Sequence, residues 1–347
     1  MPSILGFAAK KALQSTEERP VLQPKRCLNS KQGKAKCIAC VELCPEHVIR
    51  LPEKGAADWD KCLNCGICAA ACPAQAISFP TVQQRQLYQM LHDGQQTHVL
   101  GCEQAEGETQ SKALCLAAYP WESIAALALV GKLELVSGDC AACPHAEKQP
   151  FYEQTLELVE EFLGTERFAA RVTFRAPKEK GSGGVSRREL LARMLPGKAK
   201  KTAQAQTMKC STDGQILRAM LLETVKRAPD KTQSCNWRAP AVTEVCSGCG
   251  ICERMCPAQA IRIQEQEGQW YAVCTPVLCT DCGICELVCA EGAIRGMEPV
   301  ALQAEQFHKV YPLKAESCKG CGVAVRQGEE LCARCKARKQ KRGKAMA

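Results

Sequence analysis

The chain has 347 residues, a net charge of +9 and 27 cysteines. This length exceeds one ordinary domain and indicates two or three, and no apolar stretch is long enough for a membrane-spanning helix. Most of the cysteines fall in C-x-x-C groups and their total is odd, which argues against a disulfide framework. We therefore expect a reduced, metal-binding protein of the cytoplasm.

The positive charge is concentrated in two stretches. Residues 176–209 contain nine Lys or Arg against two acids, and residues 336–347 contain six against none. We interpret the first as part of a basic helical linker, residues 176–240, and the second as a disordered basic tail, residues 337–347. Neither stretch is accompanied by a nucleic-acid-binding fold or by stacking aromatic residues, so we do not expect nucleic acid as a partner.

The first cysteine block, residues 20–80, contains two copies of one spacing. In the complete copy the cysteines are separated by two, two and three residues and a proline follows: Cys62, Cys65, Cys68, Cys72 and Pro73. The degenerate copy before it consists of Cys37, Cys40, Cys44 and Pro45. Lys34 occupies the place of its first cysteine, and Cys27 is the nearest candidate to fill it. Cys27 could do so if residues 28–36 loop out.

A second block, residues 241–296, repeats the spacing twice more. Its copies are Cys246, Cys249, Cys252 and Cys256, and Cys279, Cys282, Cys285 and Cys289. Four copies in two pairs form an internal repeat, which indicates two similar modules. Three of the four copies have glycine after the second cysteine, where it permits close approach of the backbone to a bound group.

Both blocks resemble bacterial-type ferredoxins with two 4Fe–4S clusters. In that family three cysteines of one motif bind one cluster, and the fourth cysteine binds the cluster of the partner motif. The resemblance implies four clusters with these ligands: Cys27, Cys37, Cys40 and Cys72; Cys62, Cys65, Cys68 and Cys44; Cys246, Cys249, Cys252 and Cys289; Cys279, Cys282, Cys285 and Cys256. If Cys27 were not a ligand, its cluster would be labile or have three irons. Structural zinc is the alternative, although zinc prefers two separated C-x-x-C pairs.

The region between the blocks, residues 81–175, has the pattern of a small α/β domain with a parallel sheet. Strands are expected over residues 97–100, 133–136 and 168–174, and helices over residues 121–130 and 151–163. Three cysteines lie at or just after the strand ends, where sites form in open α/β sheets, namely Cys102, Cys140 and Cys143, and Cys115 lies on the intervening segment. They could bind a further iron–sulfur cluster or zinc, with His145 as a spare ligand, or be buried reduced thiols. The arrangement loosely resembles the small iron–sulfur subunit (delta) of methyl-viologen-reducing hydrogenase.

The last cysteine group, within residues 315–336, consists of Cys318, Cys321, Cys332 and Cys335. Two C-x-x-C knuckles with an expected short β-hairpin between them resemble a zinc ribbon, and four thiolates at this spacing favour tetrahedral zinc. A rubredoxin-like iron site is the alternative. Three cysteines remain: Cys274 is expected to pack in a core, and Cys210 and Cys235 have no visible partner.

The expected fold class is therefore α+β, with two dicluster ferredoxin modules flanking a small α/β domain and a C-terminal zinc-ribbon-like knuckle. No dinucleotide-binding fingerprint and no nucleophile–base arrangement is readable, so we expect no catalytic residues. The leading interpretation is an electron-transfer protein or subunit that relays single electrons to or from a partner oxidoreductase, within a larger complex. The alternatives are a reductase with its reacting centre in the α/β domain, and a metal-dependent sensor or interaction protein that uses the zinc ribbon and basic tail.

Overall fold

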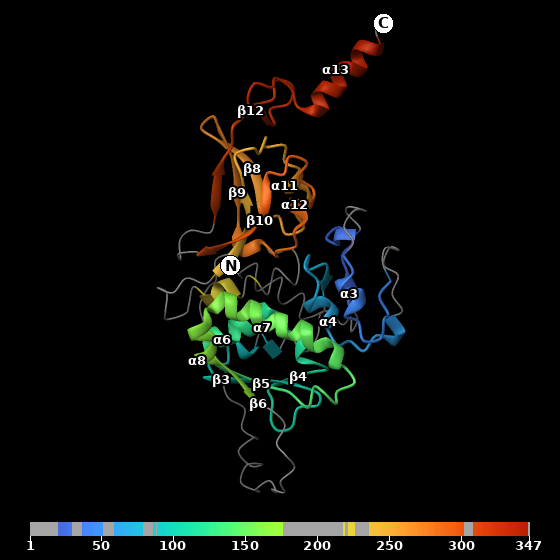
Figure 1. Ribbon diagram of the computed structural model, residues 1–347, viewed down its shortest axis with the longest axis vertical. Coiled ribbons are helices and arrows are strands. Elements are labelled where there is room, and N and C mark those ends of the chain that lie inside the picture. Colours follow the sequence, from blue (N-terminus) through green and yellow to red (C-terminus); the bar gives the residue numbers. More distant parts are fainter. Residues whose placement is uncertain are drawn as a thin grey trace, which may run out of the picture.

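The computed structural model describes residues 20–29, 37–50, 59–78, 86–87, 89–175, 218, 221–225, 236–301 and 308–345. The α/β domain lies at one end of the long axis with the first cysteine block beside it, and the second block and the C-terminal knuckle follow along that axis (Figure 1). Cys210 and Cys235 lie outside the described residues. Within the described ranges, no helix has the length and apolar character needed to cross a membrane.

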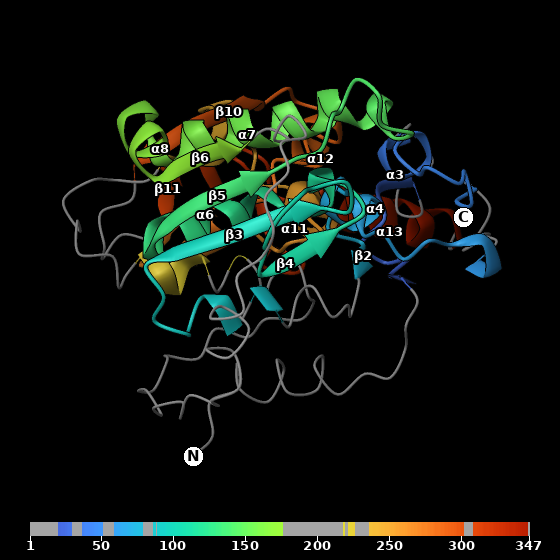
Figure 2. The same ribbon diagram turned by 90° about the horizontal axis from the view of Figure 1, so that it is seen from below.

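The middle domain is built on a four-stranded parallel sheet. Its strands lie in the order β4 (Ser111–Ala113), β3 (Thr97–Cys102), β5 (Lys132–Val136) and β6 (Val172–Arg175), and Figure 2 shows them side by side. The helical elements are η2 (Leu116–Ala118), α6 (Trp121–Val130), η3 (Ala146–Lys148), α7 (Gln149–Leu163) and α8 (Thr165–Arg171). Leu100, Leu133 and Ile124 are fully buried between the sheet and α6. The predicted parallel sheet is confirmed.

One predicted strand of this domain is wrong in its first half. Residues 168–174 were expected to be extended, but α8 occupies Thr165–Arg171 and only Val172–Arg175 pairs with β5. Gly164, with a φ of 82°, ends α7 and lets a new helix begin at once. The Glu, Ala and Arg residues that follow are good helix formers, whereas β-branched residues favour the strand.

The first cysteine block is small and closed by a two-stranded antiparallel ribbon. Its elements are β1 (Val21–Leu22), α3 (Ala39–Glu42), η1 (Trp59–Lys61), α4 (Ile67–Ala70) and β2 (Ile77–Ser78), and β1 pairs with β2. Helix α4 packs against η2 of the middle domain, because the fully buried Ile67 belongs to the same core as Leu116. The block is thus fixed to the α/β domain by its second cysteine motif.

The second cysteine block contains more β-structure. Its elements are β7 (Asn236–Val242), α11 (Ile251–Met255), β8 (Ile261–Gln266), β9 (Gln269–Cys274), η5 (Pro276–Leu278), α12 (Ile284–Leu287), β10 (Ile294–Ala301) and β11 (Lys309–Pro312). Strands β11, β9 and β8 form one antiparallel sheet, and β10 pairs with β7. Cys274 ends β9 and is 1% exposed, so its predicted place in the core is confirmed.

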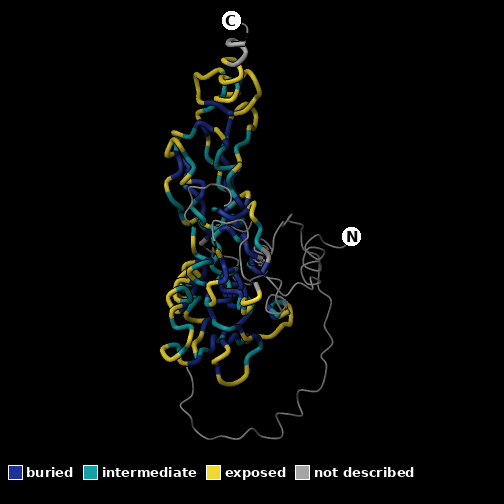
Figure 3. The backbone as a smooth tube through the Cα atoms, turned by 90° about the vertical axis from the view of Figure 1, so that its right-hand side faces the viewer, coloured by how far each residue is buried: buried dark blue, intermediate teal, exposed yellow. Residues whose placement is uncertain are grey.

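The C-terminal segment differs from expectation in two ways. Its hairpin, β12 (Ala315–Ser317) with β13 (Ala324–Arg326), encloses the first knuckle instead of lying between the two, because only one strand forms between the knuckles and its partner precedes Cys318. The tail expected to be disordered forms α13 (Ala333–Ala345), since Ala, Lys, Arg and Gln dominate its sequence and favour a helix. This segment is largely exposed at one end of the molecule (Figure 3).

A buried ion pair connects the middle domain to the helical residue Arg218. Arg218 Nε lies 3.2 Å from Glu122 Oε1, and both side chains are at least 93% buried. Arg218 also stacks on Trp121 of α6. Gln75 of the first block donates a second hydrogen bond to the same carboxylate oxygen. The pair therefore joins three segments of the chain.

Replacing Arg218 with methionine should destabilise the fold strongly, because it leaves the Glu122 carboxylate buried without its cation. We expect a loss of about 3–5 kcal/mol in the free energy of unfolding, measured by urea denaturation. Arg175→Met is the matched control, since its pair with Glu134 at 2.9 Å is 30% exposed on both sides and should contribute at most about 1 kcal/mol. Equal losses of unfolding free energy in the two variants would contradict the conclusion that burial makes the Arg218–Glu122 pair the more important one.

Candidate metal centres

The four repeats share one backbone geometry around their last cysteine. Three residues beyond it, each repeat has a residue in the left-handed conformation: His47, Gln75, Gln259 and Gly292. Four residues beyond it, a backbone N–H points at the cysteine sulfur, with N–Sγ distances of 3.4 Å for Cys44 and 3.2 Å for Cys72, Cys256 and Cys289. Hydrogen bonds to sulfur are one of the means by which proteins tune iron–sulfur clusters.

Glycine begins the short helix in three of the repeats. Gly66, Gly250 and Gly283 precede α4, α11 and α12 with φ values of 81°, 69° and 68°, a conformation that side chains resist. In the degenerate repeat the equivalent residue is Ile38, with a φ of −124°. This loop therefore enters its helix along a different path, consistent with a distant first cysteine.

The cysteines of the first block gather in two sets. Burial raises the pKa of Cys40 to about 12, and the nearby charges of Cys72, Cys37 and Cys27 raise it further. Burial likewise raises the pKa of Cys68, followed by the charges of Cys65, Cys40, Cys44 and Cys62. Cys27 thus lies with the set expected for it, and the two sets meet at Cys40 and Cys68.

A cavity marks the second of these sets. Most of its lining residues are cysteines and apolar residues, together with the acid Glu46: Cys44, Cys62, Cys65, Cys68, Pro20, Pro45, Val48, Ile49, Leu63 and Gly66. Such a lining suits a cofactor that is held by thiolates and shielded from water. The residues present therefore fit an iron–sulfur cluster.

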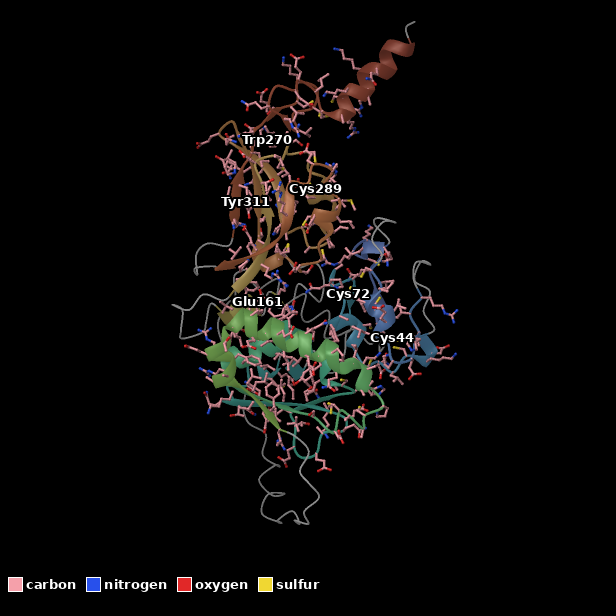
Figure 4. All side chains as sticks on the ribbon, in the orientation of Figure 1. Cys44, Cys72, Glu161, Trp270, Cys289 and Tyr311 are labelled. Carbon is pink, nitrogen blue, oxygen red and sulfur yellow. The ribbon has the colours of Figure 1, made fainter. Side chains whose placement is uncertain are left out.

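The second block shows the same grouping. Burial raises the pKa of Cys252 to about 12, and Cys246, Cys249 and Cys289 add to the shift. Burial raises the pKa of Cys285, and Cys279, Cys282 and Cys256 then contribute. Thiols packed this closely repel one another when ionised, so a bound cationic centre is needed to hold them all as thiolates. Figure 4 shows Cys44, Cys72 and Cys289 following one another along the molecule.

The structure also brings together the four cysteines of the middle domain. Burial raises the pKa of Cys115, and the charges of Cys102, Cys140 and Cys143 raise it further. All four line one cavity beside the carboxyl ends of β3 and β5. Backbone N–H groups point at two of the sulfurs, from Gly138 to Cys102 at 3.3 Å and from His145 to Cys143 at 3.4 Å. His145 itself lines the same cavity.

Tyr152 of α7 is a residue of this cavity that sequence reasoning missed. Its hydroxyl is buried and has no hydrogen-bond partner among the described residues. Burial raises its pKa, and the charges of Cys140, Cys115 and Cys102 raise it further. The only signal in the sequence is its place in an amphipathic helix after the last cysteine, which also fits ordinary packing.

The C-terminal cysteines form a tighter site. Their sulfurs all lie within 4.8 Å of one another, and those of Cys321 and Cys332 are 3.6 Å apart. Tetrahedral zinc with Zn–S bonds of about 2.3 Å places its sulfurs about 3.8 Å apart. Backbone N–H groups, first that of Cys332, lower the pKa of Cys318 to about 6. These four residues fit one tetrahedral metal ion.

Comparison with protein families bears on both cysteine blocks. Residues 245–293 match the 4Fe-4S dicluster domain, and residues 57–78 match the 4Fe-4S binding domain. The chain contains two 4Fe–4S ferredoxin-type domains. The matches cover well under half of the chain, and the second leaves out Cys27, Cys37, Cys40 and Cys44. Comparison with curated proteins gave no significant match.

Proposed function

We propose that the chain is a multi-cluster electron-transfer protein or subunit that relays single electrons to or from a partner oxidoreductase. The observation that supports it best is the proximity of the two cysteine sets within each ferredoxin block, where Cys40 acts electrostatically on Cys68 and Cys252 acts on Cys285. Each 4Fe–4S cluster, when bound, accepts and releases one electron at a potential set by its surroundings. The protein's part is to hold four such groups in sequence and to shield them from water.

The order of the sets follows from their contacts. Cys115 of the middle domain and Cys65 of the first block pack against the same apolar core. The two sets of the first block meet at Cys40 and Cys68. In the second block, Cys252 of one set acts electrostatically on Cys285 of the other. Cys249 is the exposed cysteine of the last set, which favours that end of the series as the docking end for a redox partner.

We further propose an iron–sulfur cluster at Cys102, Cys115, Cys140 and Cys143. Among the described residues, only the C-terminal cysteines form a group compact enough for a single metal ion by mutual sulfur distance. The middle set shares the wider spacing of the ferredoxin sets, which suits a cluster better than one zinc. The buried Tyr152 hydroxyl supplies a donor for a cluster sulfur.

Iron, sulfide and zinc analysis of anaerobically purified protein, with EPR of the reduced form, tests the proposed function. We expect about sixteen irons for the ferredoxin sites, two to four more for the middle site, and one zinc. Reduced protein should show signals from more than one interacting cluster. Protein that is folded but free of iron and acid-labile sulfide would refute the proposal.

The C-terminal site should bind zinc without contributing to electron transfer. Cys332→Ser removes one ligand, so we expect zinc to fall from one per chain to near zero while the iron content is unchanged. Zinc and iron analysis of the variant and of the wild type measures both effects. If Cys332→Ser removed one iron and no zinc, the site would instead be rubredoxin-like.

A further inference from the structure

Arg26 lies buried where the two ferredoxin modules meet. Its side chain is 7% exposed. Nε donates to the carbonyl oxygens of Ala74 and Gln75 in the first module, both at 3.2 Å, and Nη1 donates to that of Pro257 in the second at 2.7 Å. Nη2 is buried and has no acceptor among the described residues. One guanidinium group therefore binds the segments that follow the last cysteine of two motifs, and Pro257 lies 231 residues from Arg26 in the sequence.

A cysteine set faces Arg26 from each module. Cys27, Cys37 and Cys72 of the first module share one apolar cluster with Cys282, Met255 and Ile284 of the second. Burial lowers the pKa of Arg26, and the charges of Cys256, Cys72 and Cys282 oppose that shift. Arginine retains its proton in proteins, so a fixed positive charge lies between the two sets. We call these two sets the inner sites: Cys27, Cys37, Cys40 and Cys72 in the first module, and Cys279, Cys282, Cys285 and Cys256 in the second.

We propose that electrons cross between the modules at the inner sites and that Arg26 is the positioning residue of this crossing. The inference rests on the proposed function. In the transfer, one electron leaves one inner site and arrives at the other, so no further reactant is required. Arg26 fixes the two sites against each other through three hydrogen bonds. Because its positive charge lies close to both sites, Arg26 stabilises the added electron on either one. It therefore favours the reduced form of both sites and does not set the direction of electron transfer.

Redox titration followed by EPR tests this role in the full chain with Arg26→Gln and Arg26→Lys. The neutral variant should make reduction of two of the clusters about tenfold less favourable, which corresponds to about 59 mV. The other clusters should change little. Magnetic interaction between the two inner clusters should weaken as their contact loosens. Lysine retains the charge, so Arg26→Lys should restore most of the potential shift.

Arg254→Gln is the matched control. Arg254 is exposed and donates a hydrogen bond to the carbonyl oxygen of Cys249, which belongs to the other cysteine set of the second module. Solvent screens its charge, and it should leave the two inner potentials unchanged. The inference is overturned if Arg26→Gln shifts no potential at full iron content, or if Arg26→Lys shifts them as much as glutamine does. Loss of iron from two sites in Arg26→Gln alone supports it, whereas equal loss from all sites in both variants assigns Arg26 a folding role only and overturns it. Wild-type protein without clusters would refute the proposed function as well.

Discussion

Cys27→Ser should convert one four-iron cluster into a three-iron or labile one while the other clusters remain. Lys34 stands where the degenerate motif lacks its first cysteine, and Cys27 is the nearest cysteine that could complete the set. It is buried, and Asn29 donates a hydrogen bond of 2.5 Å to the carbonyl oxygen of Cys37, which holds the start of the insertion against the motif. We expect a loss of about one to four irons per chain, measured by iron analysis, and a three-iron EPR signal after oxidation.

Cys274→Ser is the matched control for that experiment. Cys274 is as buried as any ligand, and Cys279 and Cys285 act on it electrostatically, after burial, to raise its pKa. It nevertheless lies outside every motif, at the end of β9. We expect it to keep the full iron content. Full iron in Cys27→Ser, or equal loss in both variants, would contradict the assignment of Cys27.

The cysteine sets could be predicted from the sequence because their spacing acts locally. Three cysteines within seven residues share one loop, and the loop's glycine and the proline after the last cysteine fix its conformation. The matched left-handed residues at Gln75 and Gln259 show how closely two repeats agree. The ends of β3 and β5 were likewise predictable, since apolar runs that end in glycine and cysteine define both the strand and the site beyond it.

Other features depend on contacts that no local pattern contains. Arg26 reads as one more basic residue before a cysteine, and its role follows only from Pro257, 231 residues away. The position of Tyr152 depends on how α7 packs against the sheet. The predictions at α8 and α13 were wrong because neither segment has the apolar periodicity that identifies a helix from sequence. Both segments nevertheless contain residues that favour a helix.

The middle site has the second large expected effect. Cys140→Ser with Cys143→Ser removes two of four ligands, so we expect loss of all two to four irons of that site and retention of the ferredoxin iron. The two residues lie in the loop after β5 and are part-exposed, whereas the sheet core is formed by Leu100, Leu133 and Leu135. The domain should therefore still fold, with unchanged far-UV circular dichroism.

His145→Ala separates the cysteine site from one that uses the neighbouring imidazole. His145 lines the cavity, but four thiolates already complete the ligand set, so this variant should retain all iron. Iron analysis and visible absorption of the three proteins, the wild type included, decide the matter. An unchanged iron content with one zinc fewer in the double variant would make the middle site structural. In that case the relay would end at Cys44, Cys62, Cys65 and Cys68, and electrons would have to leave the first module there.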